Sequence, residues 1–139
     1  MKDTVIGAIQ ARFQSFADLA SVVADETLSQ QLPLAKNKSL QEHFWCLVGA
    51  RESYTRAIEQ DEWAGFSCSL QALDQVSILE GLRRSAETFA QTIPAMGDLS
   101  PKQAELLVAL LEHEVMHEGQ MIRQMYALGH DLPPSWRWA

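Results

Sequence analysis

The fold is decided by the stretch SPKQAELLVALLEHEVMHEGQMIRQMYALG, which spans residues 100–129. Ser100 is a favourable N-cap, Pro101 suits the first helical position, and Gln103 completes a capping box with Ser100. Gly129 is expected to end the helix in the left-handed conformation. Between them, one face repeats at spacings of three and four residues, which predicts a helix over 101–128. That face comprises Leu106, Leu110, His113, His117, Met121, Gln124 and Leu128.

Three more amphipathic helices are predicted before this one. They cover residues 3–24, residues 39–60, and a segment that begins between 69 and 74 and ends before Pro94. No strand-length alternation occurs, so we predict an all-α four-helix bundle, one domain over residues 1–139, with a long connection between helices two and three. The expected apolar stripe of the third helix is Leu73, Val76, Leu79, Leu82, Ala86 and Phe89.

The composition favours an ordinary globular protein. Hydrophobic residues make up 47% and charged residues 21%, which argues against wholesale disorder. The net charge of −7 disfavours nucleic acid as a partner, and no apolar run is long enough for a membrane span. With only Cys46 and Cys68 and no recognisable export signal, we expect a cytoplasmic protein with reduced thiols.

Two histidines interrupt the apolar face of the last predicted helix. His113 and His117 are four residues apart, so their side chains lie one turn from each other on the same face. Buried imidazoles need partners for both nitrogens, and two adjacent rings cannot both be charged without repulsion. A core histidine bonded to an ordinary acceptor is the commoner case for one ring. A bound divalent metal such as Zn, Ni or Fe satisfies both rings.

The second predicted helix offers two further ligands. His43 lies in its apolar stripe, and Cys46 follows three residues later on the flank. Three ligands from two facing helices, with a position left open, are typical of a catalytic metal site. His130 follows Gly129 and is expected on the surface.

Two better-known motifs fit less well. Residues 113–117 match H-E-x-x-H, but the zinc proteases with this motif need a third ligand downstream and a sheet to hold the substrate. Residues 114–117 also match the Glu-x-x-His half-motif of di-iron bundles, which requires a second copy that the chain lacks. Neither is favoured.

The stretches SLQEHFWCLVGA (39–50) and HEVMHEGQ (113–120), followed by Gly129 and Pro133-Pro134, resemble the DinB/YfiT-like superfamily of metalloenzymes. The resemblance implies a four-helix bundle, often a homodimer, with a divalent metal held by three histidines. Characterised relatives include thiol-dependent S-transferases and a maleylpyruvate isomerase, and many members have no assigned reaction.

The resemblance places His113 and His117 on the two ligands of the last helix. The third ligand is open: the motif alignment puts Cys46 in its slot, whereas the helical wheel favours His43, one turn earlier. A Cys thiolate is a sound zinc ligand. A lost or weakened metal site is the remaining possibility.

These observations lead to two hypotheses about function. In the first, the metal activates water or a substrate thiol, so the protein is an S-transferase or hydrolase acting on a small molecule, with a low-molecular-weight thiol as a possible cosubstrate. Glu114 is then a candidate catalytic group, and Arg51 and Tyr54 are candidates for binding an anionic cosubstrate, although surface or core-edge roles are commoner for both. The alternative is a non-catalytic metal-binding or interaction bundle that has lost the reaction.

The C-terminal segment SWRWA (135–139) has two tryptophans in four residues. Frayed chain ends are rarely this apolar. We therefore predict that the segment folds back on the bundle or docks on a partner subunit.

Overall fold

The computed structural model describes residues 1–139 and is all-α. Its helices are α1 (Lys2–Val22), α2 (Asp25–Ser29), α3 (Leu40–Gln60), α4 (Gln75–Thr92) and α5 (Pro101–Ala127). The four long helices confirm the predicted bundle of helices, and only the five-residue α2 was not expected. None of the helices combines the length and apolar character needed to cross a bilayer.

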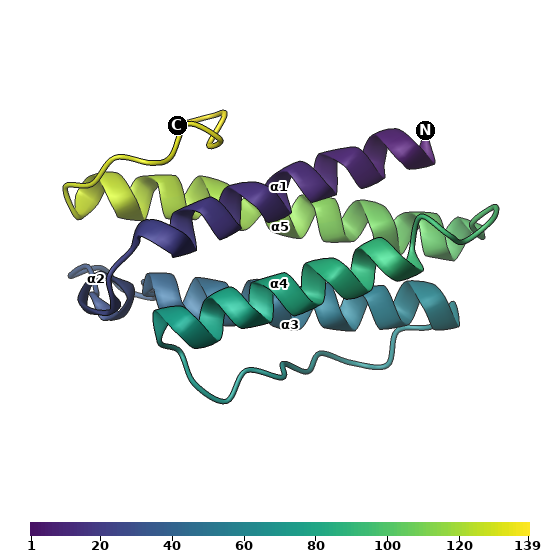
Figure 1. Cartoon of the computed structure of the whole chain (residues 1–139), viewed down its shortest axis with the longest axis horizontal. Coiled ribbons are helices and arrows are strands. Elements are labelled where there is room, and N and C mark those ends of the chain that lie inside the picture. The colour runs from purple at the N-terminus through teal and green to yellow at the C-terminus, as the bar shows by residue number, and fades with distance from the viewer.

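The four long helices pack in a ring in which each one contacts two neighbours. α1 packs against α4 and α5, and α3 packs against the same two helices. As Figure 1 shows, α1 and α5 run in one direction and α3 and α4 run in the other. The parallel α3–α4 pair is possible because residues 61–74 return along the whole length of α3 before α4 begins, as the predicted long connection requires.

The predicted helix ends are present. Ser39 and Ser100 both form capping boxes, with Glu42 and Gln103 respectively. Asp74 caps α4 by accepting a hydrogen bond from the Ser77 backbone N–H, 2.9 Å away. Gly129 has a positive φ of 82°, which explains why a glycine follows α5.

The expected stripe on the third helix was partly wrong. Leu82 and Phe89 are buried as predicted, but Val76 is 76% exposed, and the buried side chain near the start of α4 is Ile78. Two apolar rows run side by side on α4, and a pattern search cannot tell which one faces the centre. The row with Val76 and Leu79 borders a groove shared with α1.

Two glycines allow the 61–74 connection to lie close against the helices. A Cβ atom on Gly49 of α3 would collide with the Phe66 ring and lie 2.9 Å from the Cβ of Cys68. A Cβ atom on Gly81 of α4 would lie 2.6 Å from Leu70. Glycine is a weak helix former, so its presence inside α4 is explained by this close packing rather than by helix propensity.

The C-terminal segment folds back on the bundle, which is one of the two predicted outcomes. Trp136 is only 3% exposed, and its ring packs edge-on against Phe16 with centroids 5.2 Å apart. Its indole N–H donates a 2.8 Å hydrogen bond to the Ser15 carbonyl of α1. Trp138, by contrast, is 64% exposed.

We expect Trp136→Ala to lower the free energy of unfolding by about 3 kcal/mol, because a large buried ring and its hydrogen bond are lost. Urea denaturation followed by circular dichroism measures this. Trp138→Ala is the matched control and should change stability by less than about 0.5 kcal/mol. Equal effects of the two substitutions would contradict the docked arrangement.

We expect Gly49→Ala to destabilise the protein by about 1–2 kcal/mol, since the added methyl group must displace the connection that packs on α3. Gly7→Ala is the control, because nothing lies within 4 Å of a Cβ at that helical position. It should be neutral or stabilise by up to about 1 kcal/mol. Thermal or urea unfolding of both variants provides the comparison.

Candidate metal centre

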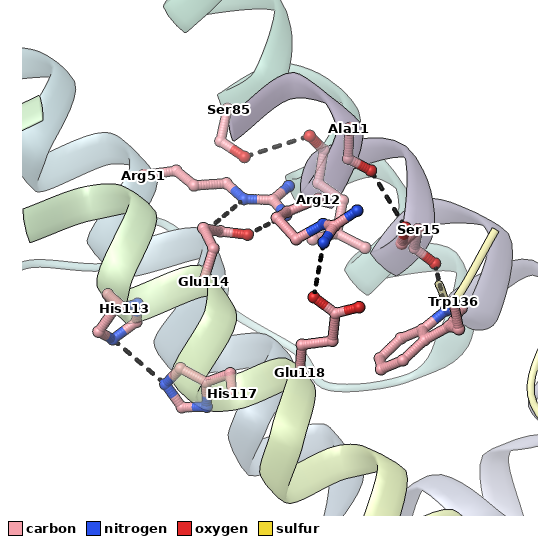
Figure 2. Close-up of polar contacts among 11 residues, drawn as sticks. Ala11, Arg12, Ser15, Arg51, Ser85, His113, Glu114, His117, Glu118 and Trp136 are labelled. Carbon is pink, nitrogen blue, oxygen red and sulfur yellow. Dashed lines mark hydrogen bonds and ion pairs between the residues drawn. The ribbon is translucent and has the colours of Figure 1, made fainter. Parts of the chain in front are cut away.

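The two histidines of α5 face the same space. His113 and His117 lie one turn apart, as their spacing predicts, and Figure 2 shows their rings side by side on α5. Their Nε2 atoms are 3.2 Å apart. His117 is fully buried and His113 is half-buried, so neither ring is turned out to solvent.

Cys46 of α3 completes a cluster of three possible metal ligands. Its Sγ atom lies 3.7 Å from His113 Nε2. The donor atoms of Cys46, His113 and His117 all lie within 4.8 Å of one another. The structure therefore brings together a triad from two antiparallel helices that can bind a metal ion, as the sequence suggested.

Two of the three distances between these donor atoms match those around a tetrahedral ion. Zinc lies about 2.0–2.1 Å from imidazole nitrogen and about 2.3 Å from thiolate sulfur. For tetrahedral angles these bonds place two nitrogens about 3.3 Å apart and a sulfur about 3.6 Å from a nitrogen. The observed distances of 3.2 and 3.7 Å are close to both values. Three protein donors leave one position of a tetrahedron for another ligand.

His43 approaches His117 from the other edge of its ring. The Nδ1 atoms of the two residues are 2.8 Å apart, a hydrogen-bonding distance, and the rings are nearly perpendicular, at 85°. His43 is outside the triad. The two candidate ligands of the second predicted helix are thus separated in space, with Cys46 in the cluster and His43 behind it.

The imidazoles are neutral at pH 7. Burial lowers the pKa of His43 and His113 to about 4. Burial and the neighbouring His113 and His43 rings lower the pKa of His117 to about 3. Neutral imidazole is the form that binds metals. Burial also raises the pKa of the Cys46 thiol.

Glu114, the candidate catalytic group, is fully buried and engaged with Arg51. The Arg51 Nε and Nη2 atoms donate hydrogen bonds of 3.0 and 2.9 Å to its two carboxylate oxygens. Burial raises the pKa of Glu114, while the Arg51 charge opposes this shift. Figure 2 shows this pair pointing away from the two histidines.

Of the two candidates for holding a cosubstrate, Arg51 is not free to do so and Tyr54 lies at the edge of the core. Arg51 is fully buried, and its guanidinium lies 4.0 Å from the centroid of the Phe13 ring. Tyr54 packs against Trp63, with ring centroids 4.9 Å apart. Arg51 is therefore a core residue rather than a contact at the mouth of the site. His130 is exposed, as predicted.

A second buried ion pair was not predicted from the sequence. Glu118 of α5 and Arg12 of α1 approach within 3.2 Å, with little exposure of either side chain. Burial raises the pKa of Glu118, and Arg12 opposes this shift. The available signal was the spacing of Glu114 and Glu118, which form a row beside the histidines at the same interval of four residues. When this row is buried, each glutamate needs a positive charge from another helix to compensate its own.

Comparison with models of known protein families finds no match. Comparison with curated proteins finds none either.

We expect the metal-free protein to lose stability as the pH falls from about 6.5 toward 4. The unfolded histidines bind protons near pH 6.5, whereas the folded ones do so only near pH 3–4. The unfolded state therefore gains protons first and is favoured. Urea unfolding at about pH 7 and about pH 5 measures the difference.

His113→Gln should reduce this pH dependence, and His130→Gln should not. The raised pKa values of Glu114 and Glu118 act in the opposite direction. Because both carboxyl groups are present in all three proteins, the comparison between variants isolates the histidine contribution. An unchanged slope in His113→Gln would contradict the burial of a neutral imidazole.

Proposed function

We propose that this protein is a divalent-metal-dependent enzyme of the DinB/YfiT type. In it, Cys46, His113 and His117 hold the ion. The observation that carries this proposal is the approach of three donor atoms from α3 and α5 to within 4.8 Å. The motif resemblance of both helices supports the same assignment. We further propose that the reaction is a thiol-dependent S-transfer or a hydrolysis of a small molecule.

A divalent ion at such a site supplies Lewis acidity, which makes a nucleophile of water or a thiol near neutral pH. The residues of this chain supply the setting. The two neutral imidazoles and the Cys46 sulfur form the donor set, and zinc, nickel and iron all suit nitrogen and sulfur ligands. Burial is the main influence on the pKa of all three groups, and the Lys38 charge favours the deprotonated form of each. An anionic substrate is therefore favoured at this position.

The small-molecule substrate is also supported by the surroundings of the triad. Trp45 and Met116, which neighbour the ligands in the chain, are each more than 40% exposed. Trp45 packs on Phe66 of the connection, with ring centroids 5.1 Å apart. Exposed apolar side chains can contact a small organic molecule, and these two precede Cys46 and His117 in the chain.

We also propose that the protein is a homodimer. This proposal rests on the resemblance alone, and the mass of the protein in solution tests it.

One observation favours the alternative, a metal-binding or interaction bundle without catalysis. A groove of 810 Å³ lies between α1 and α4, and it is lined by Phe13, Val76, Leu82 and neighbouring side chains. None of the triad residues borders it. An enzyme whose substrate site is distant from its metal would be unusual. Turnover therefore has to be measured separately from metal binding.

We expect protein purified without an affinity tag to contain one equivalent of a divalent transition metal per chain. Cys46→Ala and His113→Ala should lose most of it, because each removes one of three protein ligands. Cys68→Ala is the matched control, since Cys68 is also a free, half-buried thiol but lies outside the triad. Elemental analysis by mass spectrometry gives the stoichiometry.

The outcome separates the two functions. Metal in the wild type, together with thiol- or water-dependent consumption of an electrophilic small molecule that Cys46→Ala abolishes, supports the enzyme. Stoichiometric metal without turnover across a panel of thiols and electrophiles supports the metal-binding bundle. A wild-type protein that takes up no zinc, nickel or iron even after addition of the salts would rule out both.

A further inference from the structure

His43 contacts the candidate metal centre through a single atom pair. Its Nδ1 lies 2.8 Å from the Nδ1 of His117, and the residue is 97% buried. A polar group so deeply buried is normally paired. In this structure its partner is His117.

Only one hydrogen atom can lie between two nitrogens at this distance. A neutral imidazole, the form that binds a metal, carries one proton and has one nitrogen lone pair. Either His117 Nδ1–H donates to His43, or His43 Nδ1–H donates to His117. The two cases differ at the far edge of the His117 ring. The first leaves a lone pair on His117 Nε2, and the second leaves a hydrogen there.

Only the first case gives His117 a free donor atom where the triad needs one. His117 Nε2 is the atom that faces His113, 3.2 Å away, and belongs to the cluster with Cys46. A hydrogen on that atom would prevent it from binding a cation. Metal-binding histidines characteristically donate their second N–H to an acceptor that fixes the ring and the tautomer.

We propose that His43 is a positioning residue rather than a metal ligand. It accepts the Nδ1–H of His117 and holds the Nε2 lone pair of that ring toward Cys46 and His113. This inference rests on the proposed metal site. The two nitrogens of one imidazole ring point in different directions, so a group in contact with His117 Nδ1 is on the wrong edge to share an ion at Nε2.

His43 has no counterpart at the other histidine. The Nδ1 atom of His113 is buried and has no hydrogen-bond partner. Of the two imidazoles on α5, only His117 has a hydrogen-bond partner at Nδ1. The orientation of the pair therefore depends on the His43–His117 contact.

Three variants test the proposal. His43→Phe keeps a ring of similar size but removes the acceptor. His43→Asn keeps an acceptor near the position of Nδ1, and His130→Asn is the control at an exposed histidine. Circular dichroism first establishes that each protein is folded. If His43→Phe does not fold, the comparison of His43→Asn with His43→Ala replaces it.

The first measurement is zinc affinity by competition with a chromophoric chelator. We expect His43→Phe to bind one zinc per chain with affinity reduced about 10- to 100-fold, as for other residues that orient a ligand. His43→Asn should recover most of the loss, and His130→Asn should match the wild type. Loss of stoichiometric zinc in His43→Phe, equal to that in Cys46→Ala, would make His43 a ligand and overturn the proposal. Unchanged affinity would overturn it as well.

The second measurement does not require metal. Long-range nitrogen–proton correlation spectra of the metal-free protein at about pH 7 report which ring nitrogen carries the proton. We expect His117 to be the Nδ1–H form in the wild type and in His43→Asn, and to lose that preference in His43→Phe. A His117 ring protonated on Nε2 in the wild type would overturn the proposal.

The two measurements also separate this inference from the proposed function. A protein that binds no metal but has His117 as the Nδ1–H form, dependent on residue 43, would refute the enzyme and retain the contact. A protein that binds metal equally well with and without an acceptor at position 43 would retain the metal centre and refute the positioning role.

Discussion

The buried ion pair between Arg51 and Glu114 fixes how α3 and α5 meet, and the candidate metal centre depends on that register. Both side chains are fully buried, and the two parallel hydrogen bonds of 3.0 and 2.9 Å allow one relative position of the two helices. Glu114 follows His113 directly, and Arg51 lies five residues after Cys46. A slip of one turn between the helices would separate the sulfur from the imidazoles and leave two buried charges unpaired. Such a break typically costs about 3–5 kcal/mol, whereas an apolar contact would tolerate several registers.

α5 carries two rows of polar side chains, one of histidines and one of glutamates, which contact different residues. His113 and His117 face α3, while Glu114 and Glu118, one residue further along each time, reach Arg51 of α3 and Arg12 of α1 (Figure 2). Glu114 is hydrogen-bonded and Glu118 is ion-paired to an arginine, and neither belongs to the cluster of candidate ligands. The imidazoles are left with Cys46 and His43 as their polar neighbours. The C-terminal segment is attached to α1 close to this ion pair, because Trp136 donates a hydrogen bond to Ser15, one turn from Arg12.

Periodicity was sufficient for the elements that depend on local sequence. The capped starts at Ser39 and Ser100, the glycine after α5 and the inward direction of His117 all follow from spacing, and the structure has them. The burial of Glu114, Glu118 and Arg51 could not be predicted from spacing. A charged residue can be predicted to be buried only when its partner on another helix is known. The exposed Val76 is a second kind of failure, since two apolar rows on α4 compete and only the neighbouring helices select between them.

The question left open between His43 and Cys46 shows the same limit at atomic scale. Both lie within one turn of α3 and both contact α5. A helical wheel favours His43 because of its direction on the helix, whereas the motif alignment favours Cys46 because of its position in the sequence. The structure places Cys46 Sγ with the Nε2 atoms and His43 Nδ1 behind His117.

With a thiolate in the donor set, a site that holds a divalent ion carries one net positive charge rather than the two that three imidazoles would leave. That difference matters in a half-buried site that already feels the Lys38 charge, because an uncompensated charge is costly where water is partly excluded. A thiolate in the place of a third imidazole therefore lowers the electrostatic cost of holding an ion.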